Sequence, residues 1–353
     1  MGERITVFVG LDVGDKFTDF CVLDDVGAVV ETGRFRTIRK SYESHLRSLG
    51  RARVVLEVGT HSRWISSVLS EGGHEVVVAN PRQVQLIWKR PKKTDKTDAL
   101  LLARLGRMDV ELLAPIRHRR REAHVDLACL RARDTLVGAR TKLINHVRGA
   151  LKPFGVRVED SSSANTFPDA AQGVLPPELL PALGPMLETL RLMNSQIAAH
   201  DKQIEQLARH VYPESKRCSQ VFGVGDLTAL AFQLTLDDPT RFKKSRFVAA
   251  FLGLTPGKDQ SGESDPQKHI TKAGDRFVRK LLVECAHRIL SPTRAQESDL
   301  RTWGLQLAAR GGKTGRKRAI VAVARKLAVL LHRLWLSGET YVASGYGPKT
   351  IAA

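Results

Sequence analysis

The chain has 353 residues, with 56 Lys or Arg against 37 Asp or Glu, so its formal net charge is +19. At roughly 150 residues per domain, this length predicts two or three domains with a sizeable core. The charge imbalance favours a polyanionic partner, and nucleic acid is the leading candidate. Hydrophobic residues at 42% exclude a mainly disordered chain, and aromatic residues at 6% argue against base stacking as the main binding device.

Short β-type and helical segments alternate over the first eighty residues. Gly and Asp separate the first three segments, which is typical of an antiparallel meander. The order is strand, strand, strand, helix, strand, helix, strand, over residues 5–14, 17–25, 28–37, 41–50, 53–59, 60–73 and 74–80. A meander followed by βαβ units predicts a mixed sheet with helices packed on its faces, and an RNase H-like domain uses this order.

Helical patterns dominate the rest of the chain. A Ser- and Pro-rich stretch over residues 155–184 indicates a linker or an irregular excursion. In the helix that follows, from Met186 to Val211, apolar residues recur every seven positions, which is typical of a coiled-coil seam and predicts a dimer or an intramolecular helical hairpin. The two sets of seam positions are Leu190, Ile197, Ile204 and Val211, and then Met193, His200 and Leu207.

We therefore expect an α/β plus α protein in three parts. Residues 1–152 would form an RNase H-like mixed-sheet domain with a trailing helix, residues 153–212 a linker and a coiled-coil helix, and residues 213–353 a mostly helical C-terminal domain. The apolar stretch from Ala319 carries Arg325 and Lys326 in its middle, so we expect a helix outside any membrane. The widely spaced cysteines are expected to be reduced, as in the cytoplasm.

Four acids on three predicted elements form a candidate metal site. Asp12 ends the first strand, Glu57 ends the fourth, and Asp95 and Asp98 lie three positions apart at the start of a helix. In the expected strand order the first and fourth strands are neighbours, so Asp12 and Glu57 would project side by side and the helix could bring the other two over them. This arrangement suits two Mg²⁺ ions about 3.5–4 Å apart, which would polarise a phosphodiester.

For each acid taken alone, a solvated strand end or a helix cap is the better explanation, whereas for the four acids together a metal site is equally favoured. Further acids nearby are expected in turns or on the solvated strand face, and no role is assigned to Asp15, Asp19, Asp24 and Asp25.

Two basic segments, residues 89–121 and 310–326, predict contacts with phosphate backbones. Such contacts give salt-dependent affinity without specifying a sequence, and the alternative is a solvated basic face. The residues expected to contact nucleic acid are Lys92, Lys93, Lys96, Arg119, Arg120, Arg121, Lys272, Arg276, Arg316, Lys317 and Arg318.

Two loops carry weaker signals. Gly223 and Gly225 in VFGVGDLTA resemble the hairpin of a helix-hairpin-helix, although an ordinary turn between helices explains them nearly as well. Ser261 precedes Gly262 in the loop from Thr255 to Asp265, where a serine could attack phosphorus and hold DNA covalently. From the residues alone, an ordinary turn is the better explanation for Ser261.

Several segments together resemble the insertion-sequence 110 family of transposases, the DEDD-type, bridge-RNA-guided recombinases. They are GLDVG, VVLEVGTHSRWISSVL, KKTDKTDALLLARL, RFKKSRFVAAFLGLTP and ITKAGDRFVRKLL, and the resemblance covers nearly the whole chain. It implies a RuvC-type RNase H-like N-terminal domain, a coiled-coil middle and a C-terminal transposase domain. It also implies that Asp12, Glu57, Asp95 and Asp98 are the metal-binding set, and that Ser261 is the nucleophile that forms a phosphoserine–DNA intermediate.

The resemblance implies partners as well. These are donor DNA, target DNA, a noncoding RNA encoded by the element, and a homodimer formed through the coiled coil that assembles to a tetramer, in the prokaryotic cytoplasm at the nucleoid. One departure from the family is that Gln260, Ser261, Gly262 and Glu263 stand where a Ser-Ser-Gly-Gly-like run is common.

Three alternatives stay open from the sequence. The first is an RNase H-like nuclease or Holliday-junction resolvase without serine chemistry. The second is an actin-like sugar kinase, because GLDVGDKFTDFCVLDD resembles the phosphate-binding hairpin of that fold. The third is a basic nucleic-acid-binding scaffold without enzymatic activity.

Overall fold

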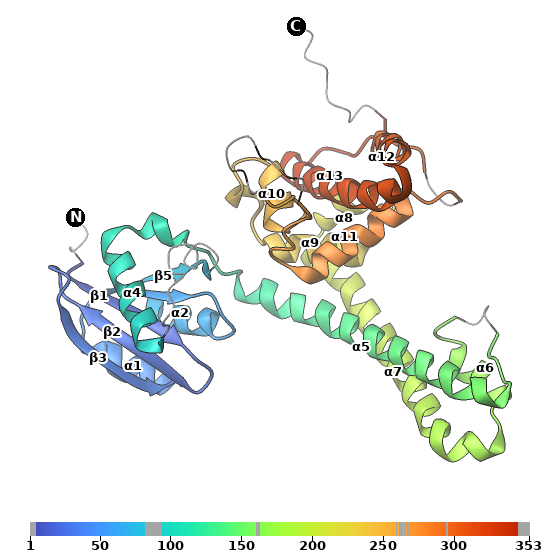
Figure 1. Cartoon of the computed structure of the whole chain (residues 1–353), viewed down its shortest axis with the longest axis horizontal. Helices are drawn as coiled ribbons and strands as arrows, with labels where there is room; N and C mark the ends of the chain where they lie inside the picture. The colour runs from blue at the N-terminus through green and yellow to red at the C-terminus, as the bar shows by residue number, and fades with distance from the viewer. Residues whose placement is uncertain are drawn as a thin grey trace, which may run out of the picture. The chain divides into compact units, whose positions relative to one another are not determined.

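A computed structural model describes residues 5–81, 94–159, 163–258, 260, 264, 266, 268–293 and 296–344. The chain divides into two compact units, Met1–His118 and Arg119–Ala353. The first is an α/β unit and the second is built of helices (Figure 1).

The first unit contains a five-stranded mixed sheet. Its strands are β1 (Val7–Val13), β2 (Phe17–Leu23), β3 (Val29–Arg36), β4 (Ala52–Glu57) and β5 (Glu75–Ala79). They lie in the order β3-β2-β1-β4-β5, with β1–β2 and β2–β3 antiparallel and β1–β4 and β4–β5 parallel. The predicted meander, the predicted mixed sheet and the predicted contact between the first and fourth strands are all confirmed.

Helices cover both faces of this sheet. They are α1 (Arg39–Arg47), α2 (Ser62–Glu71) and α4 (Asp95–Met108), and a 3₁₀ turn (Val110–Leu113) follows α4. One face packs its apolar side chains against α1 and α2, with Leu11, Leu56 and Ile65 fully buried. The opposite face meets α4, where Phe8 and Cys21 pack against Ala99 and other residues of that helix. The side chains of β1, β2, β4 and β5 therefore alternate between cores on the two faces, as the pleat requires, whereas β3 buries only Phe35.

The second unit is a set of helices around a large apolar core. The helices are α5 (Arg121–Leu151), α6 (Phe167–Gly173), α7 (Leu180–Gln206), α8 (Ser215–Ser219), α9 (Asp226–Leu236), α10 (Arg246–Phe251), α11 (Arg276–Ile289), α12 (Asp299–Arg310) and α13 (Gly315–Ser337). A turn of π-helix (Leu207–Val211) follows α7. The mostly helical character predicted for the last third of the chain is confirmed.

The predicted coiled-coil seam lies in a hairpin within the chain, because α7 packs along α5. Leu190, Ile197 and Ile204 are buried, whereas Val211 is 56% exposed. His200, the polar seam position, has its Nδ1 3.5 Å from the Sγ of Cys129 on α5. Of the two arrangements that the heptads predicted, the structure contains the intramolecular one, so a homodimer would need a surface other than these buried residues.

The stretch expected to be a linker is more ordered than its composition indicated. It contains α6, and α7 begins at Leu180 rather than near Met186. Phe167 of α6 packs in a core with Leu183 and Leu187 of α7. A proline in the first turn of each helix loses no backbone donor, whereas Pro185 lies inside α7 and removes one helical hydrogen bond without ending the helix.

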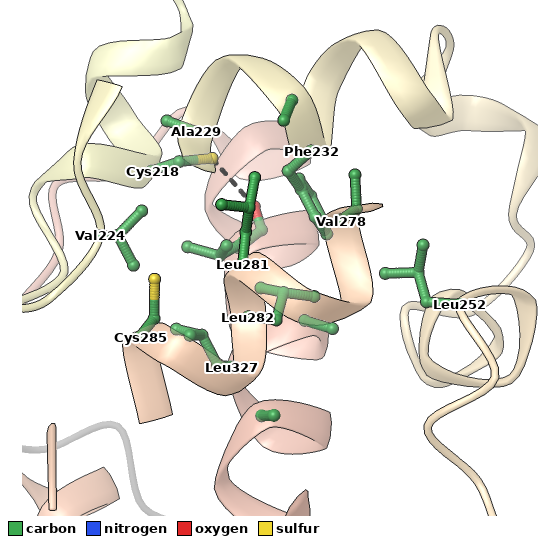
Figure 2. Close-up of a cluster of buried hydrophobic side chains, with 14 of the residues drawn as sticks. Cys218, Val224, Ala229, Phe232, Leu252, Val278, Leu281, Leu282, Cys285 and Leu327 are labelled. Atoms are coloured by element: carbon green, nitrogen blue, oxygen red, sulfur yellow. Dashed lines mark hydrogen bonds between the residues drawn. The ribbon is translucent and has the colours of Figure 1, made fainter. Parts of the chain in front are cut away.

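Figure 2 shows the core of the second unit, where α8, α9, α11 and α13 meet. Phe232, Leu281 and Leu327 fill its centre, and the thiol of Cys218 donates to the carbonyl oxygen of Leu331 at 3.7 Å. Burial raises the pKa of Cys218 to about 12, so this thiol stays protonated. All four cysteines are free, as expected.

No helix in the described part of the chain is long and apolar enough to cross a membrane.

Candidate active site

A row of charged residues crosses the sheet at the carboxyl end of β1. Asp12 pairs with Asp19 on β2, and Asp19 pairs with Arg34 on β3. On the other side of β1, Leu11 pairs with Leu56, and Asp12 and Glu57 are the next residues on these parallel strands. Because residues paired across strands point to the same face, the four side chains of the row project together. We call Arg34, Asp19, Asp12 and Glu57 the charged row.

The charged row lies on the face that α4 covers. Gly10, two residues before Asp12 on the same face, is so close to α4 that a Cβ there would lie 1.9 Å from the carbonyl oxygen of Ala99. Asp95 lies one helical turn before Ala99, towards the charged row. The absence of a side chain at Gly10 therefore allows α4 to bring its first turn over the row.

The first turn of α4 is fixed by a capping box. The hydroxyl of Thr94 accepts from the backbone N–H of Thr97 at 3.3 Å, and the hydroxyl of Thr97 accepts from the backbone N–H of Thr94 at 3.1 Å. The cap starts the helix at Asp95 and places Asp95 and Asp98 in its first turn, where the positive end of the helix dipole favours carboxylates. The KTDKTDA segment thus supplies both the cap and the acids.

A pocket of about 310 Å³ opens at this end of the sheet. Asp12, Asp19, Arg34 and Asp95 are among the residues that line it. Arg34 reaches across the pocket, with Nη2 2.8 Å from Oδ2 of Asp19 and 3.4 Å from Oδ2 of Asp95. Asp12 and Asp95 therefore line one pocket, and the guanidinium of Arg34 lies between Asp19 and Asp95.

The acids converge without forming a closed metal cage. Among the residues that the structure describes, no three His, Cys, Asp or Glu side chains are close enough together to hold one metal ion. Asp12, Glu57 and Asp98 each make a contact inside the protein. Carboxylate oxygens are nevertheless the donors that a hard divalent cation prefers.

Asp19 corrects an expectation from the sequence. It was expected on a solvated surface, yet it is 3% exposed. Its Oδ2 accepts from Nε of Arg34 at 2.9 Å, and its Oδ1 is buried without a hydrogen-bond partner among the described residues. The even spacing of Asp19 with the buried Cys21 and Leu23 was the signal for its inward direction.

Ser261 lies outside the described residues, as do Lys92 and Lys93. The segments on either side of the serine are joined as a short stem. Pro256 pairs with Ile270, and the backbone N–H of Gly257 donates to the carbonyl oxygen of His269 at 3.0 Å. The two ends of the loop that carries Ser261 are therefore held close together on the second unit.

Two of the arginines expected to contact nucleic acid are engaged inside the protein. Nε of Arg119 donates to the carbonyl oxygen of Thr235 at 2.8 Å, and burial lowers the pKa of Arg119. Nε of Arg120 lies 2.9 Å from Oδ1 of Asp237. The other expected residues in the described chain are exposed, namely Lys96, Arg121, Lys272, Arg276, Arg316, Lys317 and Arg318.

The glycine turn expected as a phosphate-binding hairpin joins α8 to α9. Gly223 has a φ of +87°, and Gly225 directly precedes the first residue of α9. Phosphate binding at this turn stays a prediction.

Comparison with known proteins identifies the family. A model of DEDD transposases of the IS110 type, described as "Transposase", matches residues 9–155. A second model, "Transposase IS116/IS110/IS902 family", matches residues 215–300. A "Putative transposase y4pF/y4sB" of Sinorhizobium fredii is 30% identical over 300 residues, which is 82% of this chain and 74% of that protein. The chain belongs to the IS110 family of transposases.

Other relatives cover the chain more fully. A "Transposase for insertion sequence element IS1111A" of Coxiella burnetii is 28% identical over 341 residues, 94% of this chain and 90% of the relative. A "Probable family 20 transposase" of Pseudomonas aeruginosa is 29% identical over 316 residues, 87% of this chain and 90% of the relative. As an IS110-family member, the chain is an insertion-sequence transposase, an enzyme that acts on DNA. This membership excludes the sugar-kinase and scaffold alternatives.

Proposed function

We propose that this transposase cuts and rejoins donor and target DNA at an active site with two parts. One part is the set of acids Asp12, Glu57, Asp95 and Asp98, and the other is Ser261. The observation that carries the proposal is the sheet register, which puts Asp12 beside Glu57 on the face under α4, where Asp12 and Asp95 line one pocket. A DEDD transposase implies a divalent metal, and carboxylates on converging elements are suitable ligands.

The four acids would hold Mg²⁺, with two ions as the expected number. A metal bound there supplies Lewis-acid polarisation of the scissile phosphodiester and neutralises its charge. The protein contributes the positions of the ligands, because the capping box at Thr94 fixes the start of α4 and the sheet fixes the spacing of Asp12 and Glu57.

Ser261 would act as the nucleophile in strand cleavage. Its Oγ loses a proton and bonds to the scissile phosphorus, while the phosphorus–oxygen bond to the departing strand breaks and that oxygen takes up a proton. The product is a phosphoserine ester, which conserves the phosphodiester bond energy for rejoining to the new strand. The stem at Pro256 and Ile270 supports this role, because it anchors both ends of the serine loop to the folded unit.

The proposal includes the partners that the resemblance implies. An element-encoded RNA would pair with both DNAs at the nucleoid, and exposed cations such as Arg316 and Lys317 would hold the backbones. Residues 1–152 would serve as an RNase H-like, RuvC-type catalytic part, residues 153–212 as linker and coiled coil, and residues 213–353 as the serine-bearing part. Homodimers that assemble to a tetramer would let the serine of one subunit meet the acids of another.

An adduct assay tests the serine chemistry. The protein is expressed with its native flanking DNA, co-purifying RNA is sequenced, and the complex is incubated with donor and target DNA and Mg²⁺. We expect a denaturation-resistant protein–DNA adduct that requires the RNA and is absent in Ser261→Ala. Ser264→Ala, in the same loop, is the matched control and should retain the adduct.

The acids are tested in the same assay. Asp12→Asn should abolish cleavage and the adduct without changing the fold, whereas Asp25→Asn, an exposed acid in a turn, should leave both intact. Full cleavage by Ser261→Ala would contradict the serine mechanism and favour the metal nuclease or Holliday-junction resolvase.

A further inference from the structure

Arg34 is a positive charge built into the acidic pocket. Its guanidinium makes two close contacts with Oδ2 of Asp19, from Nε at 2.9 Å and from Nη2 at 2.8 Å. The side chain of Asp19 is only 4% exposed. A buried carboxylate of this kind needs a cationic partner, because water cannot solvate its charge. Asp19 therefore anchors Arg34 firmly to the sheet.

The second contact of Arg34 is of a different kind. Nη2 lies 3.4 Å from Oδ2 of Asp95, and the two side chains are 50% and 67% exposed. Exposed ion pairs at such distances contribute little free energy and are easily replaced. Asp19 thus fixes the guanidinium through Nε and Nη2, and the same Nη2 makes a second, weak contact with a proposed metal ligand.

The pocket also holds an unused ligand atom. Oδ1 of Asp19 is buried, has no hydrogen-bond partner among the described residues, and belongs to a residue that lines the pocket with Asp12 and Asp95. A buried carboxylate oxygen without a donor is costly, and a nearby cation reduces that cost. Asp19 thus adds negative charge to the pocket beside Asp12 and Asp95. Lys16 also lines the pocket, and Arg34 is the cation whose ion pairs with Asp19 and Asp95 are found in the protein alone.

We propose that Arg34, anchored by Asp19, is the internal counter-cation of the acidic pocket and competes with a divalent ion for Asp95. This inference rests on the proposed metal site. Without metal, the guanidinium holds Asp95 and offsets the repulsion between carboxylates. When a divalent ion binds, Asp95 passes from Arg34 to the ion, and Arg34 stays attached to Asp19. Arg34 and Asp19 are positioning residues in this arrangement.

The chain offers a matched control for Arg34. Arg36 lies two residues further along β3, on the same face, and is also exposed. No ion pair of Arg36 is found among the described residues. Arg34→Gln and Arg36→Gln therefore remove the same charge from the same strand, and only the first removes the contacts with Asp19 and Asp95.

The experiment measures Mn²⁺ binding by the full chain without DNA, from thermal melting and calorimetric titration. Arg34→Gln should melt at a lower temperature than wild type in metal-free buffer, and it should bind Mn²⁺ about threefold more tightly than Arg36→Gln. Arg34→Lys restores the positive charge, so its Mn²⁺ affinity should return towards that of wild type. A purely structural role for Arg34 would give no such rescue.

The outcomes separate this inference from the proposed function. In one outcome, wild type binds Mn²⁺ and Asp12→Asn does not, but Arg34→Gln binds Mn²⁺ no more tightly than Arg36→Gln does. This outcome would overturn the competition between Arg34 and the ion while supporting the metal site. If no form of the protein binds Mn²⁺, both are overturned.

A second measurement needs no destabilised variant. In ¹⁵N-labelled wild-type protein, the Nε–H resonance of Arg34 is identified by its loss in Arg34→Lys and then followed during titration with Mg²⁺. We expect the chemical shift of this resonance to change as Mg²⁺ is added and to level off when the pocket is saturated, because the guanidinium loses its contact with Asp95 while keeping those with Asp19. A resonance that stays unchanged while Mg²⁺ binds would overturn the inference.

Discussion

His332 of α13 and Pro239 are joined by a hydrogen bond of 2.9 Å between Nε2 and the proline carbonyl oxygen. A carbonyl oxygen only accepts, so Nε2 carries the hydrogen and Nδ1 accepts from the hydroxyl of Ser245 at 3.0 Å. The imidazole is fully buried, and desolvation lowers its pKa. The folded protein therefore favours neutral His332.

This histidine predicts a pH-dependent stability of the second unit. The pKa of His332 is lower in the folded state than in the unfolded state. Its contribution to the free energy of unfolding is therefore fully present above about pH 6.5 and is lost as the pH falls towards the folded-state pKa. The loss is about 1.4 kcal/mol for each pH unit that separates the two pKa values. Denaturant unfolding between pH 7.5 and pH 5 should show this loss in wild type and less of it in His332→Gln. His287→Gln, at an exposed position on α11, should behave as wild type; equal slopes for all three would contradict the prediction.

A substitution at Gly10 tests how strongly the acidic pocket depends on the position of α4. Gly10→Ala should lower the free energy of unfolding by about 3 kcal/mol, because the new methyl group meets backbone atoms of α4 that cannot turn aside. Mn²⁺ binding should weaken as well, since Asp95 and Asp98 move with the helix. Gly59→Ala is the control, because its Cβ would meet nothing within 4 Å and its φ is not positive. A Gly10→Ala protein as stable as the control would show that α4 can shift without cost.

We expect Asp275 to contribute to the free energy of unfolding through its contacts between α5 and α11. Its Oδ1 accepts from the backbone N–H groups of Phe277 and Val278, and its Oδ2 pairs with Arg131 and, at 3.8 Å, with Arg119. Asp275→Ala removes a helix cap and leaves a partly buried arginine unpaired, so the free energy of unfolding should fall by about 3 kcal/mol.

Two further variants separate the parts of this effect. Asp275→Asn keeps an acceptor for the cap and should lose less stability. Asp226→Ala removes an exposed acid from the first turn of α9 and should cost at most about 1 kcal/mol. If Asp275→Ala costs no more than Asp226→Ala, the ion pairs contribute nothing measurable.

The start of α13 predicts a salt-dependent contact with duplex DNA. Arg316, Lys317 and Arg318 are consecutive and exposed. Replacing all three with Ala should reduce the slope of log K against log salt by about 2 to 3, if each neutralises one phosphate. The control replaces three exposed cations elsewhere in the same unit, Lys142, Lys152 and Lys202. If the slope of log K against log salt changed equally in the two triple variants, DNA binding would depend on net charge alone.

The sheet could be predicted from the sequence because its rules are local and topological. Turn residues and alternation define the strands, and the right-handed βαβ connection leaves few places for the fourth strand other than beside the first. Asp12 and Glu57 were therefore placed correctly as neighbours on the sheet. The approach of α4 followed from the same reasoning, since Asp95 and Asp98 begin the helix that covers this face.

The features that escaped prediction depend on partners far away in the sequence. Its charge alone makes a strand aspartate look exposed. The alternation of Asp19 with Cys21 and Leu23 indicated its inward direction, but not its cationic partner, which is Arg34 on the next strand. Arg119 reads as a surface cation in a basic segment, and its acceptor is the carbonyl oxygen of Thr235, 116 residues later. Charge and composition could not indicate that these groups are internal, because burial is decided by tertiary packing.

The hairpin of α5 and α7 has a consequence for how the protein can vary in size. α5 contains 31 residues and, at 1.5 Å per residue, is about 46 Å long. Its buried residues Ala123, Leu130, Ile144 and Leu151 are separated by multiples of seven, as are Leu190, Ile197 and Ile204 on α7. Inserting or deleting seven residues in both helices would change the hairpin by about 10 Å without altering which faces meet. The hairpin is thus a modular spacer, adjustable in whole heptads while both ends keep their packing.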